Sequence, residues 1–151
     1  IQYAPLEDAA LRIVSALRKK RTVDWSGVAT STRAKALATL EMLNFIERRP
    51  GRLTVRHQCI DFAERPSQRT ALFADSARKL AAYQNFVELL SEYSNTKPTH
   101  IALGQKLRSR LSTKWADSTA TVNAKILLDW ARTTGDAPPI LRRRKRSRNA
   151  R

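Results

Sequence analysis

The side chains most able to do chemistry in this sequence are arginines and lysines, which carry positive charge and donate hydrogen bonds. The chain has 29 of them against 13 aspartates and glutamates, so its formal net charge is +16. Six are gathered in a short stretch: Arg33, Lys35, Arg48, Arg49, Arg52 and Arg56. This excess of positive charge favours a polyanionic partner, either nucleic acid or an acidic membrane surface.

Residues that commonly form catalytic or metal sites are sparse. His57 and His100 are the two histidines, and Cys59 is the single cysteine, which excludes an internal disulfide. No cysteine–histidine cluster has zinc spacing, and no glycine loop is suited to cradling phosphate. Cys59 lies in a strand-like stretch and is better interpreted as a small buried hydrophobe than as a nucleophile. We therefore expect a protein without enzymatic activity, bound metal or cofactor.

The segment 30–57 should position the six clustered cations. Leu37, Leu40 and Leu43 recur at helical spacing, and the hydroxyls of residues 30–32 could cap the first turn of that helix. Asn44 tolerates the left-handed conformation that ends a helix. Two short strands should follow over residues 45–49 and 52–56, joined by a turn at Pro50 and Gly51, as in LTVR after FIERRPGR.

Two helices are expected before this segment. The first covers residues 6–20, and its apolar stripe consists of Leu6, Ala10, Ile13, Val14 and Leu17. A short second helix over residues 22–29 would turn Trp25 and Val28 inward.

The order of these elements resembles the second half of a winged helix-turn-helix domain, a DNA-binding superfamily. The residues that carry the resemblance are STRAKALATLEMLNFIERR followed by PGRLTV. The resemblance implies three helices and a hairpin wing over residues 1–63, with a recognition helix at 31–43 and the wing at 48–56. Asn44 stands where the family commonly has glycine. The alternative is an α+β domain whose helix merely packs on a hairpin.

In such a domain the N-terminal side chains of the recognition helix reach base edges in the major groove. The residues implied are Ser31, Thr32, Arg33, Lys35 and Ala36, of which Arg33 or Lys35 could donate to guanine. Arginines of the wing would contact phosphates or the minor groove, and they are Arg48, Arg49, Arg52 and Arg56. For each of these residues a solvated surface position is the alternative interpretation.

The second half, residues 64–137, is expected to be helical after a boundary near Ala63–Pro66. A long helix over residues 67–93 would bury one broad face, as ordinary core or as a dimer seam. Thr99 should cap a helix ending near residue 111, and Asp117 or Ser118 should cap a last helix that ends at Gly135. The core face expected for that last helix consists of Val122, Ile126, Leu127 and Trp130.

This half resembles a second, divergent helix-turn-helix unit over residues 67–135, although no wing follows Gly135. STATVNAKILLDWARTTG is its counterpart of the recognition helix. The corresponding candidates for nucleic-acid contact are Lys114, Thr119, Thr121, Asn123 and Lys125. Trp115 could stack on a base, although covering the core is the better interpretation.

Residues 138–151 end in LRRRKRSRNAR and are expected to form a basic flexible tail. Removing its seven cations from +16 leaves +9, so the rest of the chain is itself basic. The residues expected to bind phosphates are Arg142, Arg143, Arg144, Lys145 and Arg146. A solubilising end, a targeting element or a subunit tether are the alternatives.

The sequence thus predicts a mainly α protein of tandem helical units that binds nucleic acid without catalysis. Duplex DNA is the expected partner and RNA the second polyanion, with the protein acting as a regulator or as a subunit of a nucleoprotein assembly. The alternative is a winged-helix scaffold that contacts another protein, or a second copy, through the helix at 67–93. No apolar run reaches membrane-spanning length, and no signal peptide is evident. We expect a cytoplasmic protein, associated with the nucleoid in a bacterium, or a nuclear one in a eukaryote; the start at Ile1 fits a fragment of a longer chain.

Overall fold

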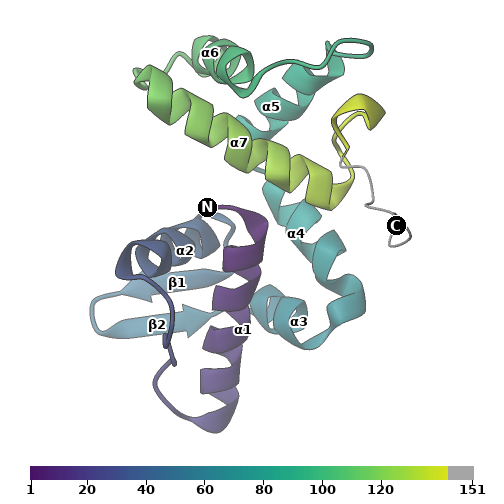
Figure 1. The fold of residues 1–151 in the computed structure, drawn as a ribbon. Helices are drawn as coiled ribbons and strands as arrows, with labels where there is room; N and C mark the ends of the chain where they lie inside the picture. The colour runs from purple at the N-terminus through teal and green to yellow at the C-terminus, as the bar shows by residue number, and fades with distance from the viewer. Residues whose placement is uncertain (143–151) are drawn as a thin grey trace, which may run out of the picture. The chain divides into compact units, whose positions relative to one another are not determined.

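The computed structural model describes residues 1–142, and this part of the chain is mainly helical with one small antiparallel sheet (Figure 1). It divides into two compact units: unit 1 covers Ile1–Gln84, and unit 2 begins at Asn85. None of the helices in residues 1–142 has both the length and the apolar character that crossing a bilayer requires.

In unit 1, two helices precede a β-hairpin in the chain and further helices follow it. Its elements, in chain order, are α1 (Tyr3–Lys19), α2 (Thr30–Met42), β1 (Ile46–Arg49), β2 (Arg52–Val55), α3 (His57–Glu64), η1 (Pro66–Gln68) and α4 (Arg69–Ala77). Helix α1 contacts α2 on one side and α3 on the other. It is therefore the central element on which the rest of unit 1 is assembled (Figure 1).

The core of unit 1 combines the apolar stripe of α1 with aromatic rings from later elements. Leu6, Ala10, Ile13 and Val14 are buried as predicted, but Leu17 is 47% exposed. The ring of Tyr3 contacts Phe73 in α4 and Phe62 in α3, with centroid distances of 4.9 and 6.2 Å. Because α3 and α4 bury their aromatic rings against α1, unit 1 extends well beyond the boundary expected at residues 63 and 64.

Arg69 joins three parts of unit 1. Its guanidinium donates to the carbonyl oxygens of Phe62 and Ala63, at 2.8 and 2.9 Å, and lies 3.4 Å from the carboxylate of Glu7. The two carbonyls belong to the last turn of α3, which lacks intrahelical partners. Arg69 therefore satisfies the end of α3 while tying α4 to α1.

The helix predicted over residues 22–29 is wrong, because this segment is an irregular loop. The carboxylate of Asp24 accepts from the backbone N–H of Ser26 at 2.9 Å, and Gly27 has φ of 76°. Both features favour a turn over a helix. Arg12 of α1 donates to the carbonyl of Asp24 at 2.7 Å and so holds the loop against α1.

Helix α2 and the hairpin occur where the sequence predicts them. The cap of α2 differs, because Ala29 is the N-cap residue and makes no side-chain hydrogen bond, so residues 30–32 lie inside the first turn. Asn44 has φ of 62°, as predicted for the residue that ends the helix. Strands β1 and β2 are antiparallel, and their register places Arg49 opposite Arg52 at the turn.

Two further predictions about segments after the hairpin are wrong. Cys59 lies in α3 and not in a strand. The long helix predicted over residues 67–93 is interrupted by a turn at residues 78–80, after which α5 (Ala81–Ser91) begins. In this turn the carbonyl of Arg78 accepts from the side chain of Gln84, at 2.6 Å. The apolar spacing on both sides suits one helix, so periodicity did not locate the break.

In unit 2, α6 (His100–Leu111) and α7 (Asp117–Thr134) pack against each other (Figure 1). Thr99 Oγ1 accepts from the N–H of Ala102 at 3.1 Å, and Gly135 ends α7 with φ of 83°, as predicted for both. The expected cap at Asp117 or Ser118 is wrong, because Ala116 is the N-cap residue of α7. Arg110 of α6 donates to the carbonyl of Asn85 in α5, at 3.1 Å.

The contact between α6 and α7 depends on small residues. A Cβ atom added to Gly104 would lie 2.7 Å from the carbonyl carbon and oxygen of Ala120, and Ala120 and Ala124 are fully buried. The predicted core face is correct for Leu127 and Trp130, Ile126 is half-buried, and the prediction is wrong for Val122, which is 52% exposed. Alanines form part of this core face because the backbones of α6 and α7 approach so closely, and the spacing of large apolar residues does not predict this.

The start of the predicted flexible tail is ordered. A short 3-10 helix, η2 (Pro139–Leu141), follows Gly135, and Leu141 is 1% exposed. The guanidinium of Arg132 donates to the carbonyl of Leu141 at 2.6 Å, and that of Arg142 to the carbonyl of Ala137 at 3.0 Å. The predicted tail boundary at residue 138 is therefore wrong.

The Gly104→Ala substitution should destabilise unit 2. The added methyl group would overlap the backbone of α7, and forced overpacking typically costs about 1–3 kcal/mol. Urea unfolding followed by circular dichroism measures the change, with Ser109→Ala on the exposed part of α6 as the control. If Gly104→Ala instead stabilises the chain, as expected for an open helical site with a gain of up to about 1 kcal/mol, the close contact is wrong.

Candidate nucleic-acid interface

The outer side of α2 presents polar and charged residues, because the helix buries its opposite side. Ala36 is buried with Leu40, so its predicted contact with nucleic acid is wrong. Ser31, Arg33 and Lys35 are exposed. Thr32, also predicted to contact nucleic acid, is half-buried. Ser31 and Lys35 lie one helical turn apart on the same face of α2, whereas Arg33, two residues from each, is exposed on another face.

Arg33 contacts the loop that precedes α2. Its guanidinium carbon lies 5.2 Å from the centre of the Trp25 ring, and Trp25 is half-buried. A guanidinium held against an aromatic face keeps donors along its edge for other acceptors. Within residues 1–142, the side chain of Lys35 forms no ion pair, so it remains open to an external anion.

One face of the hairpin is rich in arginine. Arg49 and Arg52 face each other at the turn, and Glu47 lies two residues before Arg49 on the same face. The carboxylate of Glu47 lies 2.8 Å from Arg49 and 3.2 Å from Arg56. In the part of the chain that the structure describes, Arg52 has no counterion. One carboxylate thus pairs with two of the three guanidiniums, and the face keeps a positive charge.

Glu41 ties the hairpin to α2. One of its carboxylate oxygens accepts from the backbone N–H of Arg48 at 2.9 Å, and the other lies 3.4 Å from the Arg48 guanidinium. The backbone hydrogen bond, with the nearby guanidinium, lowers the pKa of Glu41 from its usual value. Sequence reasoning missed Glu41, because a carboxylate seven residues before an arginine has no recognisable periodicity.

Carboxylates neutralise only part of the positive charge of unit 1. Residues 1–84 hold fifteen lysines and arginines and eight aspartates and glutamates. Six of the carboxylates lie within ion-pair distance of arginine: Glu7, Asp8, Glu41, Glu47, Asp61 and Glu64. Within the described residues, the cations of unit 1 without an ion pair include Lys19, Lys20, Arg21, Lys35, Arg52 and Lys79. All of these except Lys79 lie between residues 19 and 52.

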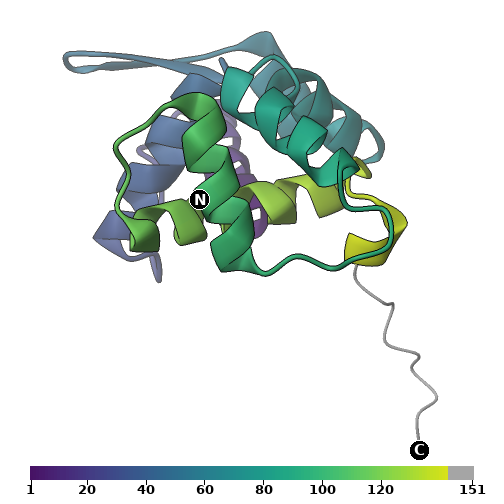
Figure 2. The ribbon, with the colours of Figure 1, turned by 90° about the horizontal axis from the view of Figure 1, so that it is seen from above.

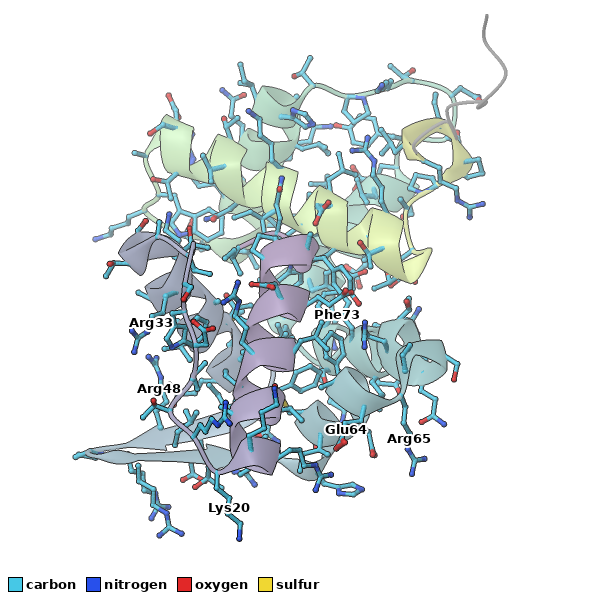
Figure 3. All side chains as sticks on the ribbon, turned by 60° about the horizontal axis from the view of Figure 1, so that its bottom comes forward. Lys20, Arg33, Arg48, Glu64, Arg65 and Phe73 are labelled. Carbon is cyan, nitrogen blue, oxygen red and sulfur yellow. The ribbon has the colours of Figure 1, made fainter. Side chains whose placement is uncertain are left out.

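The labelled side chains in Figure 3 show on which side of α1 some of these charged residues lie. Figure 3 shows Arg33 and Arg48 on one side of α1, and Glu64 and Arg65 on the other side. Figure 2 shows the turn of the hairpin standing away from the helices of unit 1. Arg33 of α2 and Arg48 of the hairpin therefore lie on the same side of α1.

The residues predicted in unit 2 form a weaker group. Lys114, Thr119 and Lys125 are exposed, whereas Thr121 and Asn123 are half-buried. Thr121 Oγ1 donates to the carbonyl of Asp117 at 3.0 Å, so this hydroxyl already has a partner. The five side chains belong to α7 and the connection before it, but they include only two cations.

Several cations of unit 2 lie near the start of α6. Partial burial, followed by the nearby charges of Lys125, Arg132 and Lys97, lowers the pKa of His100. His100 therefore favours its neutral form among these cations. Of the tail residues, Arg142 is exposed, whereas Arg143, Arg144, Lys145 and Arg146 lie outside the described residues.

The single cysteine of the chain lies in the core, unlike the exposed cations of unit 1. Cys59 is fully buried, and burial raises the pKa of its thiol to about 12. It packs as a small core residue, as predicted. Within residues 1–142, no group of three or more histidine, cysteine or acidic side chains is arranged to hold a metal ion.

Comparisons of this chain with models of protein families, with curated proteins and with solved structures find no match. The resemblance to winged helix-turn-helix domains therefore stays a prediction from the sequence. The exposed cations of unit 1 and the contacts that hold them are the features from which a function can be inferred.

Replacing Glu41 by alanine should loosen the hairpin where it meets α2. The backbone N–H of Arg48 loses its acceptor, so its hydrogen exchange should become faster. The same bond should weaken in the wild type as the pH falls through the lowered pKa of Glu41, because a protonated carboxyl no longer attracts Arg48. Amide exchange measured by NMR checks both expectations.

The backbone N–H of Phe45, which donates to Leu40 at 2.9 Å, is an internal reference for this experiment. Its exchange should change little in Glu41→Ala. Unchanged exchange at Arg48, or an equal increase at Phe45, would show that Glu41 does not fix the hairpin.

Proposed function

We propose that unit 1 binds double-stranded DNA through the exposed side of α2 and the arginines of the hairpin, as a variant of the winged helix-turn-helix arrangement. The protein would act without catalysis, as a regulator or as a subunit of a nucleoprotein assembly. The observation that supports this function is the concentration of uncompensated cations between residues 19 and 52. Each phosphate of DNA carries a negative charge, so contacts with phosphates would supply counterions for the cations that have no carboxylate partner.

Helix α2 is suited to groove contact by its exposed first turn. An α-helix fits the major groove, and arginine or lysine near its N-terminus can donate to guanine. Arg33 and Lys35 would have this role, with Ser31 near the backbone. The first N–H groups of α2 have no side-chain cap, so they could also donate to a phosphate at the positive end of the helix.

The hairpin would supply contacts beside the helix. Arg49 and Arg52 face each other across the turn, and Glu47 pairs with Arg49 but not with Arg52, so part of this like-charge repulsion remains. A phosphate or the negative potential of a narrow minor groove would relieve it. The link between Glu41 and Arg48 would keep the hairpin in a fixed direction relative to α2 during binding.

One feature departs from the arrangement that the resemblance implies. The helix that should precede the recognition helix is replaced by the loop at residues 22–29. In its place, Trp25 contacts Arg33, and Arg12 holds Asp24. The loop would therefore take over the supporting role of that helix, with α1 providing the surface on which α2 packs.

The second candidate function is a scaffold that contacts another protein. It is favoured by two exposed apolar side chains of unit 1, Met42 at 55% and Leu53 at 38%. Burial of apolar surface would make such a complex tolerant of salt, whereas duplex binding through several phosphates weakens steeply as salt increases.

The double variant Arg33→Ala/Lys35→Ala should weaken binding to a mixed-sequence DNA duplex at least about tenfold, since single base or phosphate contacts contribute about 1–3 kcal/mol. The dependence of affinity on salt should also become shallower. Fluorescence anisotropy over a salt series measures both, and circular dichroism checks that the fold is kept.

Lys79→Ala/Lys97→Ala is the matched control, because it removes the same charge at exposed positions that belong to neither α2 nor the hairpin. It should reduce affinity only slightly. An equal loss in both variants would indicate general attraction by net charge, and unchanged affinity in Arg33→Ala/Lys35→Ala would exclude α2 from the interface.

A further inference from the structure

A groove of about 350 Å³ lies between α1 and the start of the loop that follows it. Its polar lining comes from both segments and consists of Arg12, Ser15, Lys19, Arg21, Thr22 and Asp24. The volume falls at the lower end of the range for small-molecule sites. The groove is distinct from the outer side of α2 and from the hairpin.

The groove exists because residues 22–29 form a loop. Arg12 makes one wall: it donates to the carbonyl of Asp24 at 2.7 Å and to the carboxylate of Asp8 at 2.8 Å. The bond to Asp8 lies within α1 and orients the guanidinium, and the bond to Asp24 holds the loop against α1. The loop thereby flanks the groove without filling it.

The other polar groups of the groove are open to a ligand. Lys19 and Arg21 are exposed, and within residues 1–142 neither forms an ion pair. The hydroxyls of Ser15 and Thr22 have no hydrogen-bond partner in the same part of the chain. Two cations and two hydroxyls around one concave site are suited to the oxygens of a phosphate.

The acidic residue of the groove does not cancel this charge. Asp24 accepts from both the backbone N–H and the hydroxyl of Ser26, so its carboxylate oxygen is directed at Ser26 and away from Lys19 and Arg21 as a partner. Because Arg12 is paired with Asp8, counting Lys19 and Arg21 against Asp24 leaves one positive charge at the groove. An anion would therefore be attracted.

The end of α1 does not repel an anion strongly. The C-terminus of a helix carries a partial negative charge of roughly half an electron. Here the carbonyl of Ala16 accepts from the N–H of Arg21 at 3.0 Å, and that of Leu17 accepts from Lys20 at 3.3 Å. With these carbonyls occupied and four consecutive cations at residues 18–21, the local charge is positive.

We propose that this groove binds a phosphate group, held by Lys19 and Arg21 with the hydroxyls of Ser15 and Thr22. The phosphate could belong to a free nucleotide-like ligand or to the backbone of a bound duplex, and both have the same chemistry at the contact. Binding of a free phosphate goes beyond the function proposed for unit 1 and does not depend on it.

The test is an NMR titration of the full chain with inorganic pyrophosphate at constant ionic strength. The amides of residues 15–24 should shift saturably. Lys19→Ala/Arg21→Ala should weaken this binding at least about tenfold, since it removes two charge-assisted contacts. Lys79→Ala/Lys97→Ala should leave it unchanged, and so should Arg33→Ala/Lys35→Ala.

A second titration with a DNA duplex distinguishes the two sources. If the groove holds a backbone phosphate, Lys19→Ala/Arg21→Ala also weakens duplex binding, and the duplex displaces pyrophosphate. If it holds a free ligand, pyrophosphate binding is lost in this variant while duplex binding is unchanged. Both results support the phosphate site.

The proposal is overturned if neither pyrophosphate nor duplex shifts residues 15–24, or if the control variant loses as much pyrophosphate affinity as Lys19→Ala/Arg21→Ala. Failure of duplex binding by α2 would be seen separately, as unchanged duplex affinity in Arg33→Ala/Lys35→Ala. The two proposals can therefore fail independently.

Discussion

A shortage of carboxylates is the constraint on which the functional surface of unit 1 depends. Fifteen cations against eight carboxylates leave a charge of +7, and the positions of the carboxylates decide where it remains. Arg18 and Arg69 have acidic partners and join α1 to α3 and α4. The Arg18–Glu64 pair is exposed and contributes little stability by itself, whereas the Arg69–Glu7 pair is partly buried; both remove a guanidinium from competition for an external anion. Apart from Lys79, the cations without an ion pair in the described part of unit 1 lie from the end of α1 to Arg21, on α2 and at the tip of the hairpin.

The same local contacts that complete the fold also orient these cations. Glu41 fixes the hairpin to α2, and the loop at residues 22–29 supports Arg33 through Trp25. In unit 2 the main contact is the packing of α6 against α7. Gly104 allows the two helices to approach, and small buried residues form the contact. Unit 1 is therefore the more strongly charged part of residues 1–142, and its cations are held by contacts with defined geometry.

Much of the helical framework could be predicted from the sequence. The period of Leu37, Leu40 and Leu43, the turn at Pro50 and Gly51, and the ends at Asn44 and Gly135 all correspond to local rules. The predictions of helix are wrong where a side chain, and not a continuing helix, makes the hydrogen bond to the backbone. Asp24 accepts from a backbone N–H in the loop, and Gln84 donates to a backbone carbonyl at the break before α5. Within the candidate site, the arginines could be identified by type, but their partners could not. Glu41, Glu47 and Trp25 depend on contacts between elements, which periodicity does not encode.

In the proposed function, α2 and the hairpin form one surface for duplex DNA. Backbone hydrogen exchange along the full chain, measured with and without a duplex, tests this proposal. We expect slower exchange on binding at residues 30–36 and 46–56, while α3 and α4 at residues 57–77 exchange as before. Slowing confined to α3 and α4, with α2 and the hairpin unaffected, would contradict it.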